Sequence, residues 1–220
     1  MSEMHYLKPG KFIDSAAPSV VAFAREVSAA GRDDIERIIL LYKKIRDDIV
    51  YDPYVDFLDP SNYRASTVLA MRRGFCVGKA ALLSACARVI GVPARVGYAD
   101  VRNHMTSPRL YALLQTDLFV WHSYSDIHLN DRWVKATPAF NSALCERLGL
   151  RPLEFDGLCD SLFHPFDRAG HKHMEYVLDR GPYADVPFET ISADFRAHYP
   201  ALKSRHGLDG DFEQEALGDG

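Results

Sequence analysis

A cysteine directly follows a glycine turn and begins a predicted helix. Gly74 and Phe75 precede Cys76, and residues 76–90 carry the apolar periodicity of a helix. A thiol in the first helical turn lies near backbone N–H groups without a helical partner and near the positive end of the helix dipole. Because both stabilise a thiolate, we predict a lowered pKa for Cys76 and a nucleophilic role.

The base for this thiol is predicted to be His122. A catalytic histidine is usually distant from its cysteine in the sequence, and His122 is the best placed of the nine histidines. Residues 117–129 read as a strand with Val120, His122, Tyr124 and Asp126 on one face. Asn130 and Asp131 then favour a tight hairpin into a strand over 133–137.

The hairpin register supplies the third catalytic position. It pairs Tyr124 with Thr137 and places His122 diagonal to Thr137 on the same face, roughly 7–8 Å away at Cα. We therefore assign Thr137 to the position that orients the imidazole, where its hydroxyl accepts an N–H bond but carries no charge. Asp126 faces Lys135 in this register, which predicts a cross-strand ion pair.

Three further residues are predicted to contact substrate. Arg73 flanks the cysteine, His104 follows a predicted strand, and Tyr124 shares the face of His122. His164, His171 and His173 lie near Asp160 and Asp167, but their spacing fits no metal-binding pattern. We therefore expect neither a metal nor a cofactor.

The elements that must position these residues indicate an α+β fold. Helices are predicted over 18–31, 33–49, 66–71 and 76–90, followed by antiparallel strands over 94–101, 117–129 and 133–137. A short helix over 142–148 and a last helix within 186–199 follow, with 150–186 mostly irregular. We expect one domain over 1–200, with its core at 35–141 and an extension at 142–200, and a mobile acidic tail over 201–220.

Composition excludes several classes of protein. A net charge of −4 over 220 residues argues against nucleic-acid binding by the chain as a whole. The N-terminus lacks the apolar run of a signal peptide, and no segment reaches the ~20 apolar residues of a membrane helix. The four cysteines are too sparse for a disulfide scaffold. We expect a cytoplasmic protein without a membrane partner, and the oligomeric state stays open.

The ordered motifs resemble those of the transglutaminase-like superfamily of papain-like thiol enzymes. The matching segments are Gly74–Cys76, Gly91–Arg95, His122–Asp126 and Arg132–Pro138, within a resemblance that covers roughly 35–141. The resemblance implies a catalytic triad on a helix packed against an antiparallel sheet, acting on a peptide or other amide-containing substrate. It carries Cys76 and His122 over directly.

The chain departs from the family pattern at three positions. Tyr124 and Asp126 stand where the family usually has tryptophan and glutamate, and Thr137 stands where it has the triad aspartate. A polar partner for His122 could come from elsewhere, and the residues considered for that place are Asn141, Glu154, Asp156 and Glu175. Hydrolysis by water and acyl transfer to an amine both remain open.

Two other functions are compatible with the sequence. The segment Arg73–Cys76 is similar to the cysteine motif of arylamine acetyltransferases, although Arg73 replaces one glycine of that motif. A non-catalytic binding module that keeps the fold is the second alternative, and Thr137 is the reason to consider it.

Overall fold

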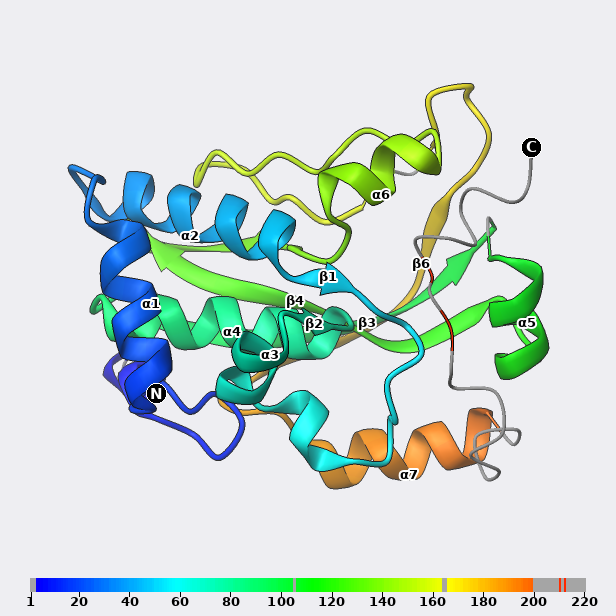
Figure 1. Cartoon of the computed structure of the whole chain (residues 1–220), viewed down its shortest axis with the longest axis horizontal. Helices are drawn as coiled ribbons and strands as arrows, with labels where there is room; N and C mark the ends of the chain where they lie inside the picture. Colours follow the sequence, from blue (N-terminus) through cyan, green and yellow to red (C-terminus); the bar gives the residue numbers. More distant parts are fainter. Residues whose placement is uncertain (1–2, 105, 164–165, 200–209, 211, 213–220) are drawn as a thin grey trace.

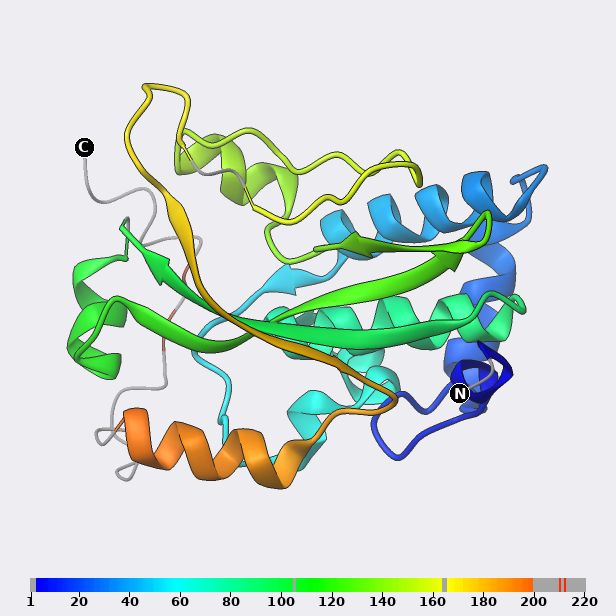
Figure 2. The same cartoon turned by 180° about the vertical axis from the view of Figure 1, so that it is seen from behind.

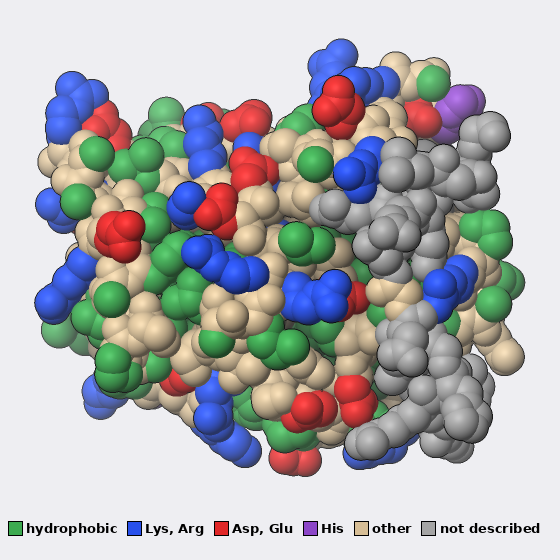
Figure 3. Space-filling view, viewed as in Figure 1, with side chains coloured by type: hydrophobic (Ala, Val, Ile, Leu, Met, Phe, Trp, Pro, Cys, Tyr) green, Lys and Arg blue, Asp and Glu red, His purple; other side chains and the backbone are tan. Residues whose placement is uncertain are grey.

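A computed structural model describes residues 3–104, 106–163, 166–199, 210 and 212. Its fold is α+β, as predicted, with helices gathered around an antiparallel sheet (Figure 1). Most of the predicted acidic tail over 201–220 lies outside the described residues, and so does His164. Across the described residues, no helix has the length and apolar content that a membrane span requires. On the face in Figure 3, basic and acidic side chains are interspersed.

The first half of the chain is helical, as the apolar periodicity predicts. Asp33 caps the second helix by accepting a bond from the backbone N–H of Glu36, which satisfies one of the open N–H groups of the first turn. The described helices of this half are η1 (Glu3–Leu7), α1 (Pro18–Ser28), α2 (Asp34–Asp48), η2 (Pro60–Tyr63), α3 (Ala65–Met71) and α4 (Cys76–Val89). Two short strands, β1 (Val50–Tyr51) and β2 (Arg73–Gly74), pair in parallel and lead into α4.

The buried helix α4 is central to the packing. It contacts α1, α2 and α3 as well as the sheet strands β3 (Ala94–Asn103) and β4 (Leu118–Leu129). The predicted role of its small residues is visible at Gly78, where an added Cβ would lie 2.7 Å from the carbonyl oxygen of Asn62. That close approach lets η2 and α3 pack directly against the turn of the helix that carries Cys76.

The four-stranded sheet has the order β5-β4-β3-β6, and all its pairs are antiparallel. Strands β4 and β5 (Arg132–Ala136) form the predicted hairpin, with Ser125 opposite Ala136 and Asp126 opposite Lys135. The predicted register is therefore confirmed. In Figure 1, α4 lies in front of the strands, and from behind the strands are seen without a helix across them (Figure 2).

Three expectations from the sequence need correction. Residues 150–186 contain a ten-residue strand, β6 (Met174–Tyr183), which pairs with β3. Helix α5 (Pro108–Leu114) was not predicted, while α6 (Ser142–Arg147) and α7 (Phe188–His198) were. Asp126 forms its ion pair with Arg95 on β3 at 2.7 Å, and Lys135, its other neighbour in register, exerts a weaker attraction.

A buried lysine joins α4 to the end of α2. Lys79 is fully enclosed, and its Nζ donates to the carbonyl oxygens of Arg46 at 3.0 Å and Ile49 at 2.5 Å. The last carbonyl groups of a helix have no helical partner, and a cation at this end also interacts favourably with the helix dipole. Lys79 therefore fixes the first turns of α4 against α2.

Replacement of Lys79 by methionine is expected to lower the free energy of unfolding by about 2 kcal/mol, because buried carbonyl groups lose their donor. Urea denaturation measures this change. Lys43→Met is the matched control, since Lys43 is exposed on α2, and its effect should stay within about 0.5 kcal/mol. Equal stability of the two variants would show that the Lys79 bonds contribute nothing net.

Candidate active site

Cys76 lies at the first position of α4, after an extended Phe75. Its side chain is in the core, with 8% of the residue exposed. Burial raises the pKa of the thiol to about 11, while the backbone N–H groups of Ser123, Val77 and Cys76 oppose the rise. The predicted lowering of this pKa is therefore wrong for the enclosed site, because loss of water outweighs the helix terminus.

His122 lies on β4 and is also buried, with 5% exposed. Burial lowers the pKa of the imidazole to about 3, and neighbouring His173 adds to the effect. Nε2 of His122 is enclosed, and no hydrogen-bond partner for it exists among the described residues. Phe163 packs its ring edge-on against the imidazole at 4.6 Å between centroids. The resting site thus holds a neutral thiol and a neutral imidazole.

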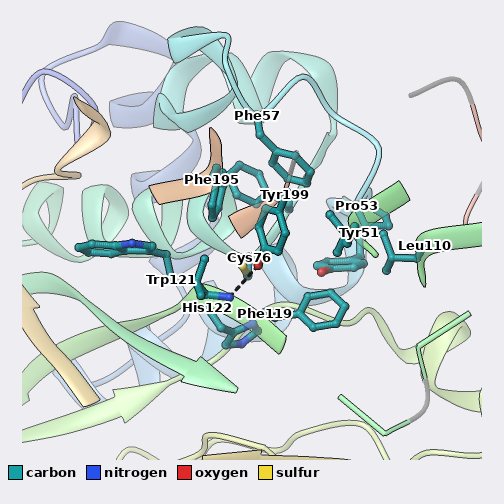
Figure 4. Close-up of a pocket in the computed structure, with 13 residues that line it drawn as sticks. Tyr51, Pro53, Phe57, Cys76, Leu110, Phe119, Trp121, His122, Phe195 and Tyr199 are labelled. Atoms are coloured by element: carbon teal, nitrogen blue, oxygen red, sulfur yellow. Dashed lines mark hydrogen bonds between the residues drawn. The ribbon is translucent and has the colours of Figure 1, made fainter. Parts of the chain in front are cut away.

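Cys76 and His122 line the same cavity (Figure 4). The cavity has a volume of about 40 Å³, which corresponds to room for roughly three waters. Its other walls are apolar and aromatic. They come from segments before, within and after β4 in the chain: Tyr51, Pro53, Phe57, Phe75, Leu110, Leu114, Phe119, Val120, Trp121, Phe195 and Tyr199. The contributions of α5 and α7 cannot be predicted from the sequence, because nothing in their own residues indicates which cavity they cover.

A β-bulge immediately precedes His122. Ala99 pairs with His122 and Val101 with Phe119, so Asp100 alone stands opposite two residues of β4, Val120 and Trp121. Trp121 has a φ of +60°, a backbone conformation that is strained for a bulky side chain. The strict alternation predicted over 117–129 is therefore interrupted at the residue before the candidate base. Nothing in the sequence marks a bulge here, since glycine is absent from the segment.

Thr137 and His122 line a second, smaller cavity of about 20 Å³. The hydroxyl of Thr137 is enclosed and has no hydrogen-bond partner among the described residues. His173 lines the same cavity, from the segment just before β6. The structure thus brings the predicted third residue to the side of His122, as the register indicated, and adds a histidine that the sequence analysis had considered only for metal binding.

The other polar groups considered as partners of His122 lie outside the described lining of both cavities. Arg46 bonds Glu154 at 2.9 Å, and Asn141 accepts a 3.4 Å bond from the backbone of Tyr51. Asp156 accepts bonds from the backbone N–H groups of a turn. Glu175 lies 3.3 Å from Nε2 of His104, the residue that follows β3.

The three predicted substrate contacts have neighbours other than Cys76 and His122 in the described structure. Arg73 forms an ion pair with Asp52 at 3.3 Å, and His104 lies 3.3 Å from Glu175. Tyr124 is buried against Gly97, where an added Cβ would lie 2.2 Å from its ring. Within the described lining of the two cavities, none of Arg73, His104 and Tyr124 is present.

No group of three potential metal ligands occurs within the described part of the chain. Nδ1–H of His171 instead donates a 2.9 Å bond to the carboxylate of Asp167, in an exposed loop. His173 faces the cavity beside His122.

A buried cysteine at a helix start, sharing a cavity with a histidine on an antiparallel sheet, is the arrangement expected of a papain-like thiol-enzyme fold. The family model of the transglutaminase-like superfamily matches residues 21–138, which is more than half of the chain. The chain belongs to this superfamily.

The chain is also similar to a solved structure over part of its length. A candidate cysteine protease of Cytophaga hutchinsonii is similar in structure, with a TM-score of 0.48 and 16% sequence identity. The match covers 61% of this chain and 41% of that chain, so this chain spans less than half of its length. No curated protein matches the chain.

Alkylation of Cys76 by iodoacetamide is expected to be slow at neutral pH and to rise up to about pH 11, because burial raises the pKa of the thiol to about 11. Peptide mass spectrometry measures the rate in a Cys159→Ser protein, since Cys159 is exposed and would compete. In the urea-unfolded chain the same thiol should have a pKa of about 8.5. A folded-state midpoint below the unfolded one would contradict the effect of burial.

Proposed function

We propose that the protein is a thiol enzyme that transfers the acyl group of an amide or related substrate through a thioester on Cys76, with His122 as the base. The supporting observation is that two segments far apart in sequence bring this thiol and this imidazole to the lining of one partly open cavity. Membership of the transglutaminase-like superfamily supports the same chemistry.

The reaction would begin from the neutral pair. An imidazole nitrogen of His122 takes the proton from the Cys76 sulfur as the sulfur attacks the carbonyl carbon. The backbone N–H of Cys76, at the open end of α4, is one donor for the oxygen that becomes negative. The imidazolium then gives its proton to the leaving nitrogen, and the carbonyl re-forms as a thioester.

The second half of the reaction regenerates the thiol. Water or an amine attacks the thioester carbonyl, His122 accepts a proton from the attacking atom, and the sulfur leaves and recovers its proton. Water makes the enzyme a hydrolase, and an amine makes it an acyltransferase.

Because the raised thiol pKa and the lowered imidazole pKa keep the proton on sulfur at rest, proton transfer in this scheme accompanies the attack on the substrate. A preformed ion pair is not required. Exclusion of water strengthens the interaction of the imidazolium and the backbone donors with the charge that develops.

The cavity lining supports a small apolar acyl group. Aromatic and aliphatic side chains form nearly all of the wall around Cys76, and a charged acyl group placed there would lose its hydration without gaining an ionic partner. The cavity is partly open, so the rest of the substrate can extend out of it.

An activated ester tests the first half of the reaction. With p-nitrophenyl acetate, a burst of p-nitrophenolate and an acetylated Cys76 are expected, detected by absorbance and by intact-mass and peptide mass spectrometry. His122→Ala should slow the burst by on the order of 10²-fold, the usual contribution of a general base. Cys76→Ala should abolish it, and Cys159→Ser is the control that should leave it unchanged. A burst that survives Cys76→Ala would rule out this thiol as the nucleophile.

A second experiment measures the preference of the site for an apolar over a charged acyl group. We expect p-nitrophenyl acetate to acylate Cys76 at least about tenfold faster than the hemisuccinate ester, because one uncompensated charge in an apolar site costs more than the ~1.4 kcal/mol that a tenfold ratio represents. The two rates are compared after correction for their uncatalysed hydrolysis. Equal corrected rates would show that the acyl group does not enter the apolar cavity.

Thr137 gives the binding-module alternative a specific basis. The side chain beside His122 carries no charge that could stabilise an imidazolium, and both members of the pair are deeply buried. This alternative requires that no activated ester acylates Cys76. The acetyltransferase alternative requires transfer of acetyl from acetyl coenzyme A to an aniline, which the same protein preparation tests.

A further inference from the structure

The bulge before His122 is held by side chains in place of regular strand bonds. In a regular antiparallel ladder, alternate backbone N–H groups donate to carbonyl oxygens of the neighbouring strand, and a bulge disrupts that pattern. Here the N–H of Val120 donates to the hydroxyl of Tyr199 at 2.7 Å (Figure 4). The N–H of Trp121 donates to Oδ1 of Asp100 at 3.0 Å.

Asp100 is itself held by a charged network. It is 5% exposed, and Arg180 on β6 donates to its two oxygens from Nε at 2.6 Å and from Nη2 at 2.9 Å. This is the two-point contact that a guanidinium makes with a carboxylate. Nη1 of Arg180 donates to Asp194 on α7 at 2.9 Å.

The same network also holds the side chain of Trp121. Its indole Nε1 donates to Asp194 at 2.7 Å, and the Arg180 guanidinium lies 4.4 Å from the centre of its ring. Backbone and side chain of Trp121 are thus both bound to one set of charges. We call Asp100, Arg180 and Asp194 the bulge clamp.

The strain at Trp121 gives the bulge clamp a consequence for the site. A bulky residue remains at a φ of +60° only where its surroundings enforce that conformation. His122 is the next residue, so the Trp121 backbone sets the direction in which the imidazole leaves the strand. If Trp121 relaxed to a negative φ, the side chain of His122 would be redirected relative to Cys76.

We propose that Asp100, Arg180 and Asp194 are positioning residues. They orient the imidazole of His122 toward Cys76 by fixing the backbone of the bulge. This inference rests on the proposed function. Arg180 and Asp194 lie beyond residue 138, where the match to the family ends, so the C-terminal part of the chain supplies part of the catalytic geometry.

A second buried ion pair in the same sheet provides a matched control. Arg95 and Asp126 join β3 and β4 at 2.7 Å near the other end of the pair, where the register is regular. In each pair, a buried aspartate binds an arginine of the neighbouring strand. Loss of either should reduce stability, but only loss of Arg180 releases the backbone before His122.

The experiment compares Arg180→Met, Arg180→Lys and Arg95→Met in the full chain. Acylation of Cys76 by p-nitrophenyl acetate should fall by on the order of tenfold to a hundredfold in Arg180→Met, the loss expected from a misplaced catalytic group. Arg180→Lys keeps the charge without the planar fork, and it should recover part of the rate. Arg95→Met should remain within about twofold of the wild type at a comparable loss of stability.

A second readout does not depend on activity. Long-range ¹H–¹⁵N spectra report the His122 ring nitrogens, assigned by their loss in His122→Ala. These signals should shift in Arg180→Met and not in Arg95→Met. If Arg180→Met does not fold, Asp194→Asn replaces it, since Asp194 is at the partly exposed edge of the clamp.

The outcomes separate this inference from the proposed function. Unchanged acylation and unchanged His122 signals in Arg180→Met, or equal losses in Arg95→Met, would overturn the positioning role. If His122→Ala leaves acylation unchanged, the proposed function fails, and the ring signals in Arg180→Met still decide whether the clamp orients His122.

Discussion

Removal of water from the thiol of Cys76 and the imidazole of His122 is the constraint on which the site depends. Burial raises the pKa of the thiol to about 11 and lowers that of the imidazole to about 3. Both groups are therefore neutral at rest, which costs far less in an apolar cavity than an ion pair would. Any charge formed during a reaction must then be stabilised by donors already in place, such as the backbone N–H groups at the start of α4.

This constraint explains why so much of the chain surrounds two side chains. The helix start must face β4, which requires the small residues of α4 and the buried contact of Lys79 with the end of α2. Helices α5 and α7 complete the apolar wall. Strand β6 extends the sheet and brings Arg180 to Asp100. The segment beyond residue 138 thus participates in the site, although it lies outside the family match.

The position of Thr137 distinguishes this chain from the usual family pattern. An aspartate beside the imidazole would favour an imidazolium through its charge, whereas Thr137 offers a hydroxyl in a small cavity that His173 also lines. A charged partner is then unavailable from this position. Under the proposed function, the orientation of His122 would then rest on the backbone that carries it, where the strained Trp121 and its charged surroundings are found.

Local sequence patterns by themselves determined several helices, the β4–β5 hairpin and the place of Thr137. Apolar periodicity predicted α2 and α4, the turn at Asn130 and Asp131 set the β4–β5 register, and that register placed Thr137 beside His122 because side chains alternate along paired strands. Only the tertiary structure decided the rest. The thiol pKa depends on burial, and α5 and α7 reach the cavity through packing that their own residues do not specify. The bulge at Trp121 is held by Asp100, Arg180 and Asp194, and no local pattern reveals contacts among residues so far apart in the sequence.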